Sequence, residues 1–107
     1  MAPIFAASEA VTVRYSLPFG LDVAPPNADG LCVCSKAGKG GEQPGDVLRF
    51  TTYWRGTTPG LYDVVKQTRM GGAKAWDSTV GALVSNDLSV TEEIVLVFER
   101  STAPPSA

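Results

Sequence analysis

The sequence contains no histidine, which removes the commonest general base and the commonest protein ligand for metals. It has only two cysteines, Cys32 and Cys34, and a zinc site built on them would need further cysteine or histidine ligands that the chain lacks. The carboxylates are scattered, and no pair of them stands out as a catalytic couple. We therefore predict a protein that is not an enzyme and uses neither a metal nor another cofactor.

Long runs of charge and of apolar residues are missing as well. Lysine and arginine occur only singly and the net charge is −2, which argues against a nucleic-acid groove or a basic membrane patch. No apolar run is long enough to span a bilayer. The first ten residues have neither a basic start nor a long apolar stretch, so we do not expect an intact signal peptide there.

The spacing of the two cysteines predicts thiols rather than a disulfide. Residues two apart on a strand share a face, but such close neighbours in sequence have poor geometry for a mutual bridge. We expect Cys32 and Cys34 to be reduced and structural, with Leu31 and Val33 on the opposite face. A redox or intermolecular role is the alternative.

A chain of 107 residues forms one domain with a modest core. Small residues and prolines without periodicity fill both ends, which is typical of tails. We predict an N-terminal tail at residues 1–9, a folded domain at 10–101 and a C-terminal tail at 102–107.

Alternation of apolar and polar residues predicts several strands. Val11, Val13, Tyr15 and Leu17 alternate with polar residues, so a half-buried strand is expected over residues 10–17. The other expected strands are Leu21–Ala24, Leu31–Ser35, Val47–Trp54, Leu61–Gln67 and Glu92–Arg100. The last of these is apolar on both faces, so it should be central in the sheet or covered on both sides.

One substantial helix is expected at Trp76–Ser85, with Asp77 or Ser78 as its N-terminal cap. Its apolar stripe, spaced as a helix packs against a sheet, consists of Trp76, Val80, Leu83 and Val84. The predicted fold is therefore mainly β, a partly open antiparallel barrel of five to six strands capped by a late helix.

The most informative segment follows the first strand and reads Pro18-Phe19-Gly20-Leu21. A glycine in such a turn lets consecutive backbone N–H groups converge on one point, which makes a concave site for an anion. The tetrapeptide alone is weak evidence, because similar turns occur in many proteins.

Four segments in this order together resemble the PDZ domain. They are the turn at residues 18–21, Pro44–Leu48, Thr79–Leu83 and Glu93–Arg100. The resemblance covers roughly residues 10–101. Leu61–Lys66, Ala75–Asp77 and the closing strand resemble more particularly the single-domain PDZ-like proteins of eukaryotic algae, which tend to be targeted to plastids.

The resemblance implies binding of the C-terminal residues of partner proteins. In the family the peptide adds as a strand beside the second strand, in a groove closed by the second helix, and its carboxylate sits on the N–H groups of the glycine turn. The positions that correspond here are Phe19, Gly20, Leu21 and Val23, facing Trp76, Val80 and Leu83 on the helix. Arg14 matches a basic residue that approaches the carboxylate in many members; alternatively it is a solvated, outward residue of the first strand.

Two departures from the family pattern affect this groove. Trp76 stands where the family often has a histidine that reads the third-from-last peptide side chain. It would favour an apolar peptide residue or fill the groove itself, unless it is simply a core tryptophan under the preceding loop. Pro25 and Pro26 lack the N–H donors of a strand, so pairing should stop after about three peptide residues and binding should be weak or lost.

Two functions follow from these expectations. The first is a peripheral accessory subunit of a larger complex, attached through the tails and residues 55–75, a link longer than is usual in the family. The algal resemblance implies a plastid host such as a photosystem, with the protein in the stroma or on the thylakoid; otherwise we expect the cytoplasm. The alternative is an adaptor that binds partner C-termini in the groove.

Overall fold

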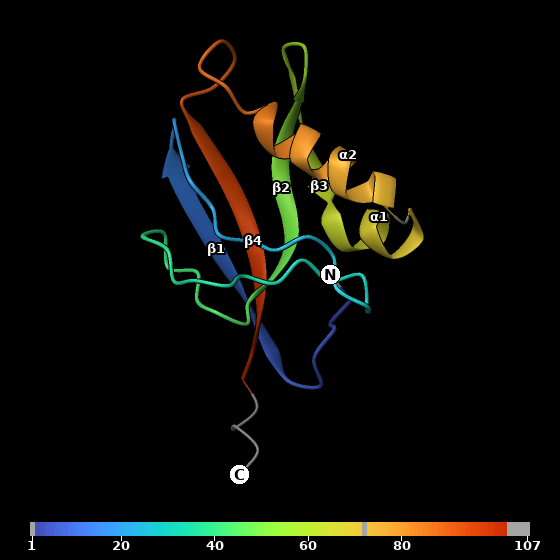
Figure 1. Cartoon of the computed structure of the whole chain (residues 1–107). Coiled ribbons are helices and arrows are strands. Elements are labelled where there is room, and N and C mark those ends of the chain that lie inside the picture. The colour runs from blue at the N-terminus through green and yellow to red at the C-terminus, as the bar shows by residue number, and fades with distance from the viewer. Residues whose placement is uncertain (1, 72, 103–107) are drawn as a thin grey trace.

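The computed structural model describes residues 2–71 and 73–102. Within them, four antiparallel strands form one open sheet in the order β1-β4-β2-β3, accompanied by two helices (Figure 1). The elements in chain order are β1 (Ser8–Ser16), β2 (Val47–Arg55), β3 (Thr58–Asp63), α1 (Val64–Met70), α2 (Ala73–Val84) and β4 (Glu93–Ser101). The prediction of a mainly β fold with a late helix is confirmed.

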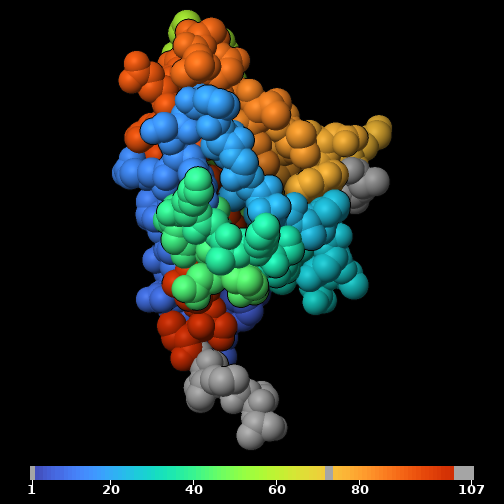
Figure 2. Space-filling view, turned by 60° about the vertical axis from the view of Figure 1, so that its left-hand side comes forward, coloured from blue at the N-terminus to red at the C-terminus, as the bar shows by residue number. Residues whose placement is uncertain are grey.

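The prediction of five to six strands is wrong, because two expected strands are reduced to isolated bridges. Residues 21–24 and 31–35 contribute only the bridges Val23–Cys34 and Val33–Val47. Pro25 and Pro26 cannot donate hydrogen bonds to a ladder, so pairing ends there. Figure 2 shows this part of the chain (cyan to green) lying on the molecular surface over the sheet.

The expected strand Leu61–Gln67 is wrong from Val64 onward. The strand ends at Asp63, whose side chain accepts the N–H of Lys66 at 3.1 Å and caps α1. An aspartate in this position satisfies one of the free amides of a helix start, so the chain turns into a helix in spite of the β-branched pair that follows. Val64 and Val65 are then buried by α1 rather than by a strand.

Helix α2 begins at Ala73, three residues before the predicted start at Trp76. Asp77 and Ser78 therefore lie inside the helix and are not its cap. The alanine-rich first turn explains the extension, because alanine has the highest helix propensity. Trp76 and Leu83 pack against the core, whereas Val80 and Val84 on the same stripe are 37% and 64% exposed.

Strand β4 is central, as predicted, and pairs with both β1 and β2. Its side chains Ile94, Leu96 and Phe98 are fully buried and form the main core cluster. The other members of that cluster are Val13, Cys32, Cys34, Leu48 and Val64.

The two cysteines are buried free thiols that share this core, while Leu31 and Val33 pack in a second cluster with Val47 and Val65. The predicted division between two faces is thus confirmed. Burial raises the pKa of the Cys32 thiol to about 11. At neutral pH this thiol is therefore protonated and a poor nucleophile.

Of the predicted N-terminal tail, residues 1–9, Met1 lies outside the described residues, and several of the others contact the folded domain. Ser8 and Glu9 belong to β1, and Ile4 and Phe5 pack on the second cluster. The N–H groups of Ile4 and Phe5 donate to the fully buried Glu99 carboxylate at 2.8 and 2.9 Å. Of the predicted C-terminal tail, Thr102 donates its N–H to the carbonyl of Ala7 at 3.0 Å, and residues 103–107 lie outside the described residues.

Glu99 also pairs with the buried guanidinium of Arg49. Burial alone would raise the pKa of Glu99, but the N–H of Phe5, the Ser8 hydroxyl, the N–H of Ile4 and Arg49 together lower it from its ordinary value of 4.5. A lowered folded-state pKa means that the stabilisation is fully present above the ordinary value and is lost as the pH falls through the folded value.

We predict that Glu99→Gln lowers the free energy of unfolding by about 3–5 kcal/mol, because it leaves the Arg49 charge buried without a counter-ion. Urea unfolding at neutral and at acid pH measures this, and the variant should lose stability less steeply on acidification than the parent. The matched control is Glu93→Gln, which breaks the exposed pair with Arg14 and should cost at most about 1 kcal/mol. Equal losses for the two variants would contradict the role of Glu99.

Candidate peptide-binding site

Residues 21–24 lie beside residues 33–35 and turn one backbone edge away from them. The N–H of Ala24 donates to the carbonyl of Val33 at 3.0 Å, and the N–H of Ser35 donates to the carbonyl of Asp22 at 2.8 Å. Because backbone polar groups of successive residues on an extended chain point to opposite sides, those of Val23 face the other way. Within the described part of the chain no hydrogen bond occupies the Val23 N–H, so this edge is open.

The turn that precedes this edge also presents free amides. In the described residues no hydrogen bond uses the N–H groups of Phe19, Gly20 or Leu21. No atom lies within 4 Å of the position that a Cβ on Gly20 would take. Packing therefore does not require glycine here, and its missing side chain leaves the neighbouring amides uncovered. Free N–H groups of successive residues can bind an anion where a turn directs them at one point.

The turn is held in place at both of its sides. The N–H of Leu17 donates to the carbonyl of Glu92 at 2.9 Å, and the ring of Phe19 stacks on Tyr15 with 6.3 Å between centroids. The Tyr15 hydroxyl donates to the buried Glu42 carboxylate at 2.5 Å. Burial, followed by this bond, raises the pKa of Tyr15. Phe19 is thus fixed against a side chain that is itself anchored.

An apolar pocket of about 340 Å³ lies between the turn and the C-terminal end of α2. Its lining consists of Leu17, Pro18, Phe19, Val84, Asn86, Asp87 and Leu88. Val84 and Leu88 are 64% and 67% exposed, so they offer apolar surface beside the free amides. The pocket is large enough to hold an apolar side chain.

The structure brings most of the site residues expected from the sequence together. Phe19, Leu21 and Val23 pack on the same core cluster as Trp76 and Leu83 of α2. Val80 lies one helical turn from Trp76 and stays partly exposed along this side of the helix. Trp76 is half-buried, so it contributes to the core and also lines a hollow beyond the open edge.

Arg14 is the expected site residue that does not join the others. Its side chain is exposed, and its Nη1 lies 3.1 Å from Oε1 of Glu93 on the neighbouring strand. Alternation along β1 directs it away from the face on which Tyr15 contacts Phe19. The alternative interpretation, an outward residue of the first strand, describes its position.

The open edge is short because residue 25 is a proline. The next outward donor after Val23 would be at position 25, where no N–H exists. Beyond it, the side chain of Asn27 accepts the N–H groups of Asp29 and Leu31 at 2.9 and 3.1 Å and turns the chain back.

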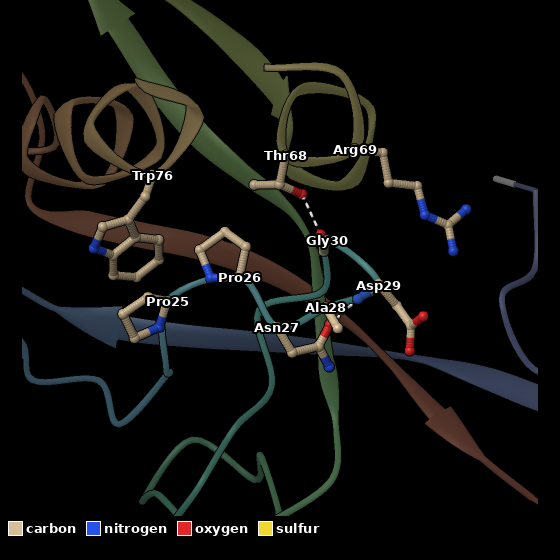
Figure 3. A pocket seen from close by; sticks show the side chains of 9 residues that line it. All are labelled: Pro25, Pro26, Asn27, Ala28, Asp29, Gly30, Thr68, Arg69 and Trp76. Atoms are coloured by element: carbon tan, nitrogen blue, oxygen red, sulfur yellow. Dashed lines mark hydrogen bonds between the residues drawn. The ribbon is translucent and has the colours of Figure 1, made fainter. Parts of the chain in front are cut away.

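A second hollow of about 730 Å³ opens at this end of the edge (Figure 3). Its lining consists of Pro25, Pro26, Asn27, Ala28, Asp29, Gly30, Thr68, Arg69 and Trp76. Sequence reasoning missed Thr68 and Arg69 because it continued a strand through Val64 and thus overlooked α1. The signal that could have revealed them is the helix cap at Asp63.

Comparison of the chain with family models, with curated proteins and with solved structures finds no match. None of the helices in the described ranges is long and apolar enough to cross a membrane. Among residues 2–71 and 73–102, no group of three or more metal-binding side chains is suitably placed for an ion. The geometry of the turn, the edge and the two hollows therefore carries the functional argument.

Proposed function

We propose that this chain is a non-catalytic protein-interaction domain that binds the C-terminal residues of a partner protein at residues 19–23. The observation that carries the proposal is the open edge at Val23, directly after three unoccupied amides and beside an apolar pocket. A free carboxylate, an apolar side chain and an extended backbone meet only at a chain terminus. This combination is what a strand-adding peptide site requires.

The order of the elements supports a likeness to the PDZ domain. The bridge Val23–Cys34 stands where the second and third strands of that fold would pair, and Val33–Val47 where the third would meet the fourth. The helix α2 follows the β2–β3 hairpin and precedes the closing strand β4, as the second helix does in that family. The likeness would make the molecule a partly open barrel in which short bridges replace two of the strands.

Recognition would use three groups of contacts. The N–H groups of Phe19, Gly20 and Leu21 bind the terminal carboxylate, and the pocket beside them takes the terminal side chain. Val23 pairs through its N–H and carbonyl with the third-from-last residue. Trp76 flanks that residue from α2 and favours an apolar side chain there.

The short edge implies weak binding of isolated peptides, since each hydrogen bond contributes only about 1 kcal/mol net. A lasting association then needs further contacts. Leu61 and Met70, both within residues 55–75, are 60% and 81% exposed and provide apolar surface for them. This favours the second candidate function, an accessory subunit held in a larger assembly. A plastid membrane complex such as a photosystem is the host that the algal resemblance suggests.

We expect peptides with a free C-terminal valine to shift the NMR signals of the Leu21 and Val23 amides. Converting the carboxylate to an amide should weaken binding by about tenfold or more, because hydrogen bonds to a charged group contribute about 1.5–3 kcal/mol. Acetylation of the peptide N-terminus is the control and should change nothing. The proposal fails if the amidated peptide binds equally well.

Replacing Pro25 by alanine restores the missing donor, so Pro25→Ala should tighten the binding of peptides of five or more residues by about two- to tenfold. The affinity of three-residue peptides should not change, because they do not reach position 25. The control is Pro59→Ala, which changes an exposed proline of β3 that lines neither the open edge nor the hollow beyond it. Calorimetric titration of both variants with both peptide lengths measures the effect, and an equal gain for short peptides would contradict the truncation.

A further inference from the structure

The hollow beyond Pro25, here called the proline hollow and defined by its nine lining residues, is larger than the pocket beside the turn. Loop 25–30 forms one wall, α1 another, and Trp76 of α2 the third (Figure 3). It begins where the open edge stops. A peptide leaving that edge therefore meets the proline hollow first.

Two walls of the proline hollow, loop 25–30 and α1, are joined by a hydrogen bond. The Thr68 hydroxyl on α1 donates to the carbonyl of Gly30 at 2.5 Å. Gly30 has a φ of +75° and lies so close to α1 that an added Cβ would approach Arg69 to 3.1 Å. Only glycine combines this backbone with this contact. The loop is thus held against α1.

The chemistry of the proline hollow is apolar on one side and charged on the other. Trp76 lies beside the rings of Pro25 and Pro26, whereas the Arg69 side chain lies at the opposite edge, on the side of Asp29, and extends away from Trp76 (Figure 3). Within the described residues Arg69 forms no ion pair or hydrogen bond, although Asp29 shares its rim. The N–H donors of the Arg69 guanidinium are therefore available to a ligand at this edge of the proline hollow.

We propose that the proline hollow binds the upstream part of the same partner segment and that Arg69 selects an acidic side chain four to six residues before the C-terminus. This rests on the proposed function. A bound strand advances about 3.3 Å per residue, so the residues that precede the third-from-last in the peptide sequence pass Pro25 and reach the hollow. Trp76 packs on the intervening residue, and a carboxylate pairs with the guanidinium. These side-chain contacts replace the backbone hydrogen bonds to the peptide that Pro25 and Pro26 cannot form.

The test uses seven-residue synthetic peptides with a free C-terminal valine and Glu, Gln or Lys at the fifth position from the end. The Glu peptide should bind the parent protein about three- to tenfold more tightly than the Gln peptide, and the Lys peptide most weakly. Arg69→Gln should abolish the advantage of Glu. Asp29→Asn should enlarge it, because a competing carboxylate leaves the rim.

The matched control is Lys66→Gln, which removes an exposed cation from the same helix outside the proline hollow and should preserve the advantage of Glu. NMR signals separate the two proposals. The Val23 amide should respond to every peptide, whereas the Gly30 amide, which belongs to the hollow alone, should respond only to peptides that reach the hollow.

If Val23 responds but Glu has no advantage, or keeps it in Arg69→Gln, the inference is overturned while the proposed function stands. A preference for Lys, or weaker Glu binding by Asp29→Asn, also overturns it. If no peptide moves the Val23 signal, both proposals fail.

Discussion

Two backbone hydrogen bonds, from Ala24 to Val33 and from Ser35 to Asp22, determine how the middle of this chain faces its surroundings. They turn the side chains of Leu21 and Val23 into the core cluster and the free backbone of Val23 outward. The same segment thus closes the core and offers an unpaired edge. Proteins usually protect such edges; here the prolines that follow shorten it, which makes it a poor template for aggregation and leaves only the short edge that the proposed function uses.

Buried carboxylates hold the loop between residues 36 and 46, which contains neither a helix nor a strand, against the rest of the fold. Asp46 forms a two-pronged ion pair with Arg100 at 2.9 and 2.8 Å, and Arg100 also donates to the carbonyl of Gly41. Glu42 holds Tyr15, which supports Phe19 in the turn. A glycine-rich loop that is too flexible to form a helix is thereby fixed by charge-assisted hydrogen bonds, and it anchors the proposed carboxylate site.

The sequence predicted what depends on local periodicity and on proline chemistry. Alternation located β1 and β4, and the missing N–H of Pro25 predicted the end of the edge. It could not predict the attachment of Ile4 to Glu99, which joins residues 95 positions apart. The sequence also did not predict α1, because the apolar pair after Asp63 suits a strand as well as a helix. Arg69 lies on α1 and was therefore not recognised as a site residue. These two features were not predictable from the sequence because one depends on a long-range contact and the other on a helix cap next to an apolar pair.

Backbone hydrogen exchange at Val23 tests the central claim most directly. In the free protein its amide should exchange rapidly, although its neighbour Ala24 is protected by the bond to Val33. Saturation with a peptide that ends in a free valine carboxylate should slow exchange at Val23 and at Phe19, Gly20 and Leu21. A Val23 amide that is already protected in the free protein, or that still exchanges rapidly at saturation, would contradict the account.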